Sequence, residues 1–262
     1  VALASIISQY MSAVLILWHM ARQGDECTFR LRDLRNGLDR TEGNGVLGLG
    51  IPAGLQNAIF AVANLFIQGA VNSFDSVMVE GNAAAANSDA IIYNVMAAFY
   101  TACSTFMGQN WGAGKRDRVL KSYFIGVAYS FVAGAILGGA LLLFGREFLS
   151  LFANDETVIE AGLQRTRIMG FSYAVSAFMD CTIAACRGIG KSLAPTVIVI
   201  MGSCVFRVVW IYTVFAHFHT IPSLYLLYIF SWTITSIAEI VCFAINYRKL
   251  TALHDAYIPE TD

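Results

Sequence analysis

The sequence has little charge, little proline and none of the cysteine patterns that hold small domains together. Only 13% of its 262 residues are charged, about half of the fraction usual in soluble domains. The net charge of −1 offers no basic excess, which argues against a nucleic-acid partner. No Cys-x-x-Cys pair occurs among the six cysteines, and five of them lie within apolar runs. They are therefore interpreted as packing residues, not as disulfides or a metal site.

Long hydrophobic runs are abundant instead. Hydrophobic residues make up 57% of the chain, and runs of about twenty uncharged residues are long enough to cross a bilayer as helices. The pattern predicts an all-α membrane protein with about seven transmembrane helices. The predicted spans are about 1–20, 47–73, 77–108, 120–144, 158–186, 193–216 and 222–247.

Basic residues alternate between the connections and so predict the orientation. The stretches 21–46 and 109–121 and the ends of spans five and seven are rich in Lys and Arg, whereas the turns 74–76 and 217–221 have none. The fourth connection breaks this alternation in part, because Arg146, Arg165 and Arg167 lie near it. Positive charge is retained on the cytoplasmic side, so the C-terminus is expected inside and the start of the chain outside. An outside start with neither a methionine nor a signal peptide leads us to expect further helices upstream.

A hydrophilic stretch separates the first two spans. Within it, three leucines recur at helical spacing close to three arginines: Leu31, Leu34 and Leu38, with Arg30, Arg32 and Arg35. A short helix lying at the membrane interface fits this pattern, and a solvated linker fits it equally well.

An amide stripe is expected on the second span. Asn57, Asn64, Gln68 and Asn72 recur at spacings of seven, four and four, which places them on one helical face. An amide in hydrocarbon is costly unless it is hydrogen-bonded, so this face must meet protein or water. The stripe is interpreted as lining a permeation pathway, with hydrogen bonding between packed helices as the alternative.

Three ionisable residues fall deep inside apolar segments: Asp180, Arg207 and Glu239. Charges at such positions usually face a protein interior or a water-filled path. They form either a structural ion pair or trio, or a site where a carboxylate binds a coupling cation or cationic substrate while Arg207 tunes its protonation.

Two further patterns concern packing. Pro52 is expected near the start of its helix, where a missing N–H costs little. Gly134 and Gly138 form a small-xxx-small step with Gly139 beside them, which predicts a close helix–helix contact in span four.

Several short motifs occur in an order that resembles one transporter family. They are Gly-Ile-Pro-Ala-Gly-Leu-Gln at 50–56, Asn64 with Ile-Gln at 67–68, Val-Asn-Ser-Phe at 71–74, Gly-Gln-Asn-Trp-Gly-Ala at 108–113, Cys-Arg-Gly-Ile-Gly-Lys-Ser at 186–192, Pro195 and Phe-Arg-Val-Val-Trp at 206–210. Together they resemble the second half of multidrug and toxic compound extrusion (MATE) transporters, in the bacterial branch similar to DNA-damage-inducible protein F.

The resemblance implies an architecture and an activity. Members of that family have twelve helices in two six-helix lobes, and they are antiporters that exchange H⁺ or Na⁺ for organic, often cationic or amphipathic, substrates; they are not enzymes. By this likeness residues 1–21 are the last helix of the first lobe, 22–46 the cytoplasmic interlobe linker, 47–250 the second lobe and 251–262 a cytoplasmic tail. The implied partners are plasma-membrane lipid, a small-molecule substrate and the missing N-terminal lobe, and no cofactor beyond the coupling ion is implied.

The chain departs from the family pattern at the cation site. Where some members carry carboxylates, this sequence has Phe60 and Ser176. Asp180 lies one turn beyond Ser176 on the same helical face and is one candidate to replace it. The resemblance implies an alternative, because other members carry the essential carboxylate in the first helix of the first lobe, which this sequence does not include. A flippase for lipid-linked oligosaccharides, from the same broad superfamily, is the alternative reading, with Arg207 facing an anionic headgroup. A seven-helix receptor fits less well.

Overall fold

The computed structural model describes residues 2–22, 24, 28 and 39–257, and these residues contain helices and no strand. The long helices are α1 (Ala2–Arg22), α3 (Arg40–Val71), α4 (Ser76–Gly112), α5 (Arg116–Leu143) and α12 (Ile221–Tyr257). The shorter elements are α6 (Gly145–Leu149), α7 (Glu156–Met169), α8 (Ser172–Gly188), α9 (Leu193–Val199), η1 (Ile200–Val205), α10 (Phe206–Trp210), η2 (Ile211–Phe215) and α11 (Ala216–Phe218).

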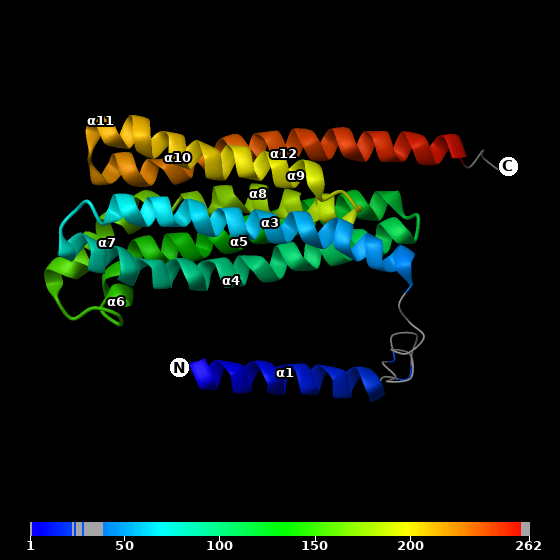
Figure 1. Ribbon diagram of the computed structural model, residues 1–262, viewed down its shortest axis with the longest axis horizontal. Helices are drawn as coiled ribbons and strands as arrows, with labels where there is room; N and C mark the ends of the chain where they lie inside the picture. Colours follow the sequence, from blue (N-terminus) through cyan, green and yellow to red (C-terminus); the bar gives the residue numbers. More distant parts are fainter. Residues whose placement is uncertain (1, 23, 25–27, 29–38, 258–262) are drawn as a thin grey trace. The chain divides into compact units, whose positions relative to one another are not determined.

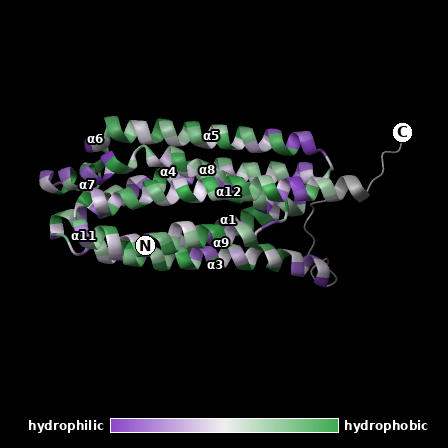
Figure 2. Ribbon diagram, turned by 90° about the horizontal axis from the view of Figure 1, so that it is seen from above, coloured by the Kyte–Doolittle hydropathy of each residue, from purple (hydrophilic) through white to green (hydrophobic). Residues whose placement is uncertain are grey.

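The predicted all-α membrane fold is confirmed. Six helices of the described chain are long and apolar enough to span a bilayer, and the bent pair α7–α8 brings the number to seven. Hydrophobic colours run along the helices and hydrophilic ones gather mainly at their ends (Figure 2). Large apolar side chains such as Phe124, Tyr129 and Ile136 of α5 are exposed, as expected of a surface that contacts lipid.

The chain divides into two compact units, residues 1–48 and 49–262. In the first unit, the side chains of residues 3–19 in α1 are exposed. Helix α3 begins at Arg40, within the stretch 22–46 that was predicted as the interlobe linker. The predicted interfacial helix around Leu31, Leu34 and Leu38 lies outside the described residues, and the assignment of lobes stays a prediction.

In the second unit, α4, α5, α8 and α12 pack closely and run side by side (Figure 1). Their contact surfaces bury Met96 and Met107 of α4, Tyr173 of α8, and Leu224 and Leu227 of α12. The short helices α6 and α11 lie at one end of this bundle (Figure 1). Burial of these large side chains sets the positions of the polar residues among them.

The glycine face of α5 is confirmed as a close packing surface. A Cβ atom on Gly134 would lie 3.1 Å from the carbonyl oxygen of Tyr173, and one on Gly138 would overlap the carbonyl oxygen of Gly170. Gly139, the next residue, has nothing within 4 Å of a Cβ atom. The two glycines therefore let the backbone of α5 approach the junction of α7 and α8.

Two expectations about helix geometry were wrong. Pro52 was expected at a helix start but lies inside α3, because that helix begins twelve residues earlier; a membrane helix tolerates such a proline because neighbouring groups can satisfy the freed carbonyl. The span predicted as continuous over 158–186 is broken into α7 and α8, which meet at an angle of 54°. Gly170 and Phe171 form the break.

The span of residues 193–218 contains two π-helical segments, η1 and η2. Between them lies one short α-helical turn, α10, which carries the buried Arg207. π-Helical turns are rare and occur often at functional sites.

Candidate functional site

A polar cavity of about 290 Å³ lies inside the second unit. It brings together three residues predicted from the sequence: Asn64 of α3, Asp180 of α8 and Arg207 of α10. The remaining lining is mostly aromatic or methionine, with one further acid: Phe60, Asp89, Tyr93, Tyr100, Met169, Met179, Tyr228 and Trp232. Helices far apart in the sequence thus converge on one space that contains charges of both signs.

Arg207 lies in a cage of three aromatic rings. Its guanidinium carbon is 4.5 Å from the ring centre of Tyr228, 5.6 Å from that of Phe60 and 5.7 Å from that of Trp232. Its Nε donates a hydrogen bond of 3.2 Å to Ser231 Oγ, while the buried Nη2 has no hydrogen-bond partner among the residues that the structure describes. Ring faces are attractive to a cation, so the cage holds the charge in place without neutralising it.

Asp180 projects into the same cavity from α8. It interacts electrostatically with Arg207 and with Arg187, near the end of its own helix. Asp180, Arg207 and Glu239 are all described residues, and no salt bridge joins any two of them. The structural ion pair or trio, one of the two alternatives left open by the sequence, is therefore not formed by these residues. The cavity holds a carboxylate and a guanidinium that are not neutralised by direct contact.

A second acid, Asp89 of α4, lines the cavity and was missed in the sequence. Its carboxylate forms a salt bridge with Arg165 of α7 and accepts a hydrogen bond from the hydroxyl of Tyr173 of α8. Arg165 was counted with the fourth connection, yet it is only 5% exposed. A charge inside the predicted span 77–108 was the available signal for Asp89, and it was overlooked.

The amide stripe of α3 is exposed. Asn57, Asn64, Gln68 and Asn72 all lie on the uncovered side of that helix, and Gln68 Nε2 donates a hydrogen bond of 2.9 Å to Asn72 Oδ1. None of the four is buried between neighbouring helices of this unit, so packing within the unit does not explain them. Their role in lining a pathway stays a prediction.

Glu239 of α12 lies apart from the polar cavity. It is fully buried, and neither of its carboxylate oxygens has a hydrogen-bond partner within the described part of the chain. Its electrostatic neighbour is Arg187 of α8. Arg187 in turn donates a hydrogen bond of 3.0 Å to Oε1 of Gln56, which also accepts one of 3.4 Å from Thr196. Gln56, a buried amide that the stripe did not include, thus ties α3 to α8 and α9.

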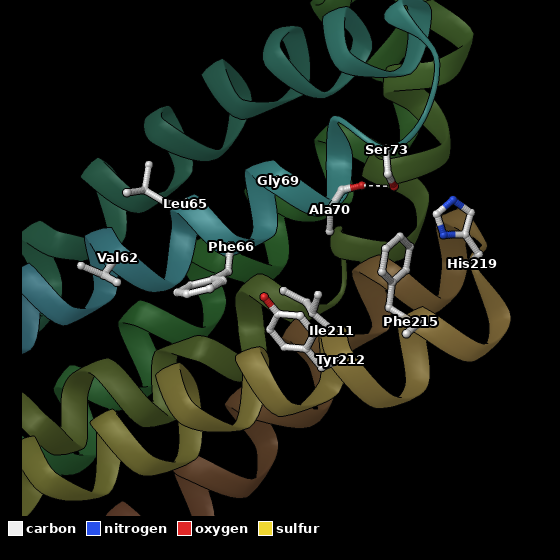
Figure 3. Close-up of a pocket in the computed structure, with 11 residues that line it drawn as sticks. Val62, Leu65, Phe66, Gly69, Ala70, Ser73, Ile211, Tyr212, Phe215 and His219 are labelled. Atoms are coloured by element: carbon white, nitrogen blue, oxygen red, sulfur yellow. Dashed lines mark hydrogen bonds between the residues drawn. The ribbon is translucent and has the colours of Figure 1, made fainter.

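An apolar groove of about 620 Å³ lies between α3 and the segment from Ile211 to His219 (Figure 3). Phe66 and Tyr212 face each other across it with their ring centres 6.4 Å apart. The imidazole of His219 lies at one end of the groove, and no carboxylate is among the described residues that line it. The groove therefore lacks the charges of the polar cavity, and we leave it out of the candidate site.

Comparisons with known proteins identify the family. The family model MatE matches residues 52–213, which is more than half of the chain. The chain is 29% identical to the probable multidrug resistance protein YpnP of Bacillus subtilis over 49% of its own length and 29% of that protein. It is 21% identical to the probable multidrug resistance protein NorM of Thermotoga maritima over 75% of its own length and 42% of that protein.

Solved structures share the fold. A MOP superfamily transporter from Pyrococcus furiosus superposes with a TM-score of 0.85 at 17% identity, over 95% of this chain and 56% of that one. A MATE protein in complex with MaL6 superposes with a TM-score of 0.84 at 17% identity, over 96% and 57%. The chain thus spans less than half of the curated relatives and little more than half of the solved structures. With the family match over residues 52–213, the chain belongs to the MatE family of membrane transporters.

Proposed function

We propose that this chain supplies one lobe of a secondary antiporter that exports organic cationic or amphipathic molecules in exchange for H⁺ or Na⁺. The polar cavity carries the proposal, because it combines an acid without a direct ionic partner, Asp180, with an aromatic lining. Aromatic faces attract organic cations, and a carboxylate adds charge complementarity. H⁺ or Na⁺ can compete with a cationic substrate for such a carboxylate, so one site can bind the ion and the substrate in turn.

Exchange requires that the ion and the substrate favour different states of the transporter. A ligand shifts an equilibrium between two conformations only as far as its affinities for them differ. In the proposed cycle, ion binding at Asp180 favours one conformation and substrate binding favours the other. Arg207 disfavours a second cation in the cavity, since like charges repel at short range.

Asn64 provides the test of the cavity as a substrate path. In the full-length protein, reconstituted in proteoliposomes, we expect Asn64→Leu to lower ethidium export driven by a H⁺ or Na⁺ gradient by roughly twofold to tenfold, the effect of one lost hydrogen bond. Membrane abundance should stay unchanged because Asn64 is exposed. Val62→Leu is the control, because Val62 lies on the same helix outside the polar cavity. Unchanged export by the Asn64 variant would remove Asn64 from the path.

A lipid flippase is the second candidate, and one observation favours it. The buried Nη2 of Arg207 has no hydrogen-bond partner in residues 39–257 and could donate to an anionic headgroup. The acids Asp89 and Asp180 in the same cavity oppose that reading. Movement of a fluorescent anionic lipid that requires Arg207, with no gradient-driven ethidium export, would favour the flippase.

The orientation follows from the basic turns and can be tested by labelling. Lys115 lies in the turn between α4 and α5, and Asn154 lies between α6 and α7. We expect single cysteines at these two positions, in a background without reactive cysteines, to react with membrane-impermeant maleimide from opposite sides. Lys115→Cys should react from the cytoplasm and Asn154→Cys from outside. Labelling of both from one side would contradict the proposed topology.

A further inference from the structure

The bend between α7 and α8 is held by a residue of a third helix. Arg165 lies before the break and Tyr173 lies after it, and both bind the carboxylate of Asp89 on α4. Arg165 donates to Oδ2, and the Tyr173 hydroxyl donates to Oδ1. One carboxylate therefore connects the two helices across a change of direction of 54°.

The contact is buried and has further support. The side chain of Arg165 is 6% exposed and that of Asp89 is 16% exposed. The Arg165 guanidinium carbon also lies 5.4 Å from the ring centre of Tyr225, whose hydroxyl donates a hydrogen bond of 2.8 Å to Asn82 of α4. Removing one partner of a buried ion pair leaves an uncompensated charge, so the arrangement is strongly favoured over one with Asp89 detached.

The same bend determines the geometry of the polar cavity. Met169 at the end of α7, and Met179 and Asp180 of α8, all line that cavity. A change in the angle at Gly170 would move Asp180 relative to Arg207, which is carried by the separate span α9–α11. Asp89 itself lines the cavity, so it lies where an ion or a substrate can reach it.

We propose that Asp89 is a positioning residue: its carboxylate fixes the bend between α7 and α8 and thereby sets the place of Asp180 opposite Arg207. The transport consequence rests on the proposed function of Asp180, whereas the structural part does not. The groups that act on Asp180 are Arg207 of α10, Arg187 of α8, and Tyr93 and Tyr100 of α4. Moving Asp180 among them changes its electrostatic surroundings and therefore the pH dependence of transport.

The first experiment measures the bend without any transport. Spin labels on cysteines replacing Asn154 and Lys191, both exposed, report the distance across α7 and α8 in the purified full-length protein. From a rise of about 1.5 Å per residue, straightening the pair would lengthen this distance by about 5 Å. We expect Asp89→Asn to shift or broaden the distribution toward longer distances. Asp75→Asn, the same change at the exposed N-cap of α4, should leave it unchanged.

The second experiment separates positioning from mere support of the fold. Asp89→Asn should move the midpoint of the pH profile of export by more than about 0.5 pH unit, whereas Asp75→Asn should not. Tyr173→Phe keeps the salt bridge and removes one hydrogen bond, so it replaces the Asp89 variant if that variant does not reach the membrane. It should broaden the distance distribution and shift the pH profile in the same direction as Asp89→Asn. An unchanged distance distribution in the folded variants overturns the bend-holding role. A changed distribution with an unchanged pH profile overturns the link to Asp180.

Discussion

Replacing Gly138 by alanine is expected to destabilise the protein severely. The added Cβ atom would overlap the carbonyl oxygen of Gly170, a backbone atom at the break between α7 and α8. A flexible side chain can turn away from such an overlap, whereas a backbone carbonyl moves only with its helix. Overpacking typically costs about 1–3 kcal/mol, and we expect Gly138→Ala to lie at or above the upper end of this range.

Thermal unfolding in detergent, followed by size-exclusion chromatography, provides the measurement. Gly139→Ala is a matched control, because a Cβ atom on Gly139 meets nothing within 4 Å and alanine favours the helix by up to about 1 kcal/mol over glycine. The two substitutions are one position apart, and the expected changes in stability have opposite signs. Equal stability of both would show that α5 does not closely approach the break between α7 and α8 at Gly170.

Replacing Asp180 by asparagine is expected to uncouple transport. Asparagine keeps the size of the side chain and its hydrogen-bonding capacity but cannot exchange a proton or attract a cation by charge. Coupling free energies between two ligands are typically about 1–3 kcal/mol, which corresponds to changes of roughly 5-fold to 150-fold. We expect Asp180→Asn to lower gradient-driven export by a factor within this range and to flatten its pH dependence. Membrane abundance should be preserved.

The measurement is ethidium export by the full-length protein across a series of external pH values, with and without Na⁺. Glu80→Gln is the control, since Glu80 is an exposed acid of α4 outside the polar cavity. Export by the Asp180 variant with a normal rate and an unchanged pH profile would exclude Asp180 as the coupling group. The coupling carboxylate would then have to be sought elsewhere, with Asp89 and Glu239 as the next candidates in this chain.

Composition and helical spacing were sufficient to predict the membrane spans and to select some residues of the candidate site. A run of uncharged residues leaves few options other than a membrane helix, and the period of 3.6 residues places small residues such as Gly134 and Gly138 on one face. The cost of burying charge likewise singled out Asp180 and Arg207. These inferences depend on local sequence alone, which explains why the spans could be predicted; the roles of Asp180 and Arg207 stay predictions.

Contacts between distant segments could not be predicted from local sequence. Asp89 and Arg165 are 76 residues apart, and neither stands out as a member of a pair until α4 and α7 are packed together. The bend at Gly170 was missed because Phe171 and its apolar neighbours continue the hydrophobic run without a proline. Glu239 was grouped with the cavity residues since depth in a span does not reveal which neighbour a side chain faces.

The π-helical segments around Arg207 bear on how this span tolerates insertions and deletions. A π turn closes its hydrogen bonds from residue i to i+5, one residue more than an α turn. Loss of one residue within Ile200–Val205 or Ile211–Phe215 can therefore be absorbed by conversion of that turn to an α turn. The same deletion within the uninterrupted helix α8 would rotate every following side chain to a new face. In alignments with other MatE proteins, single-residue gaps in this span belong in η1 and η2.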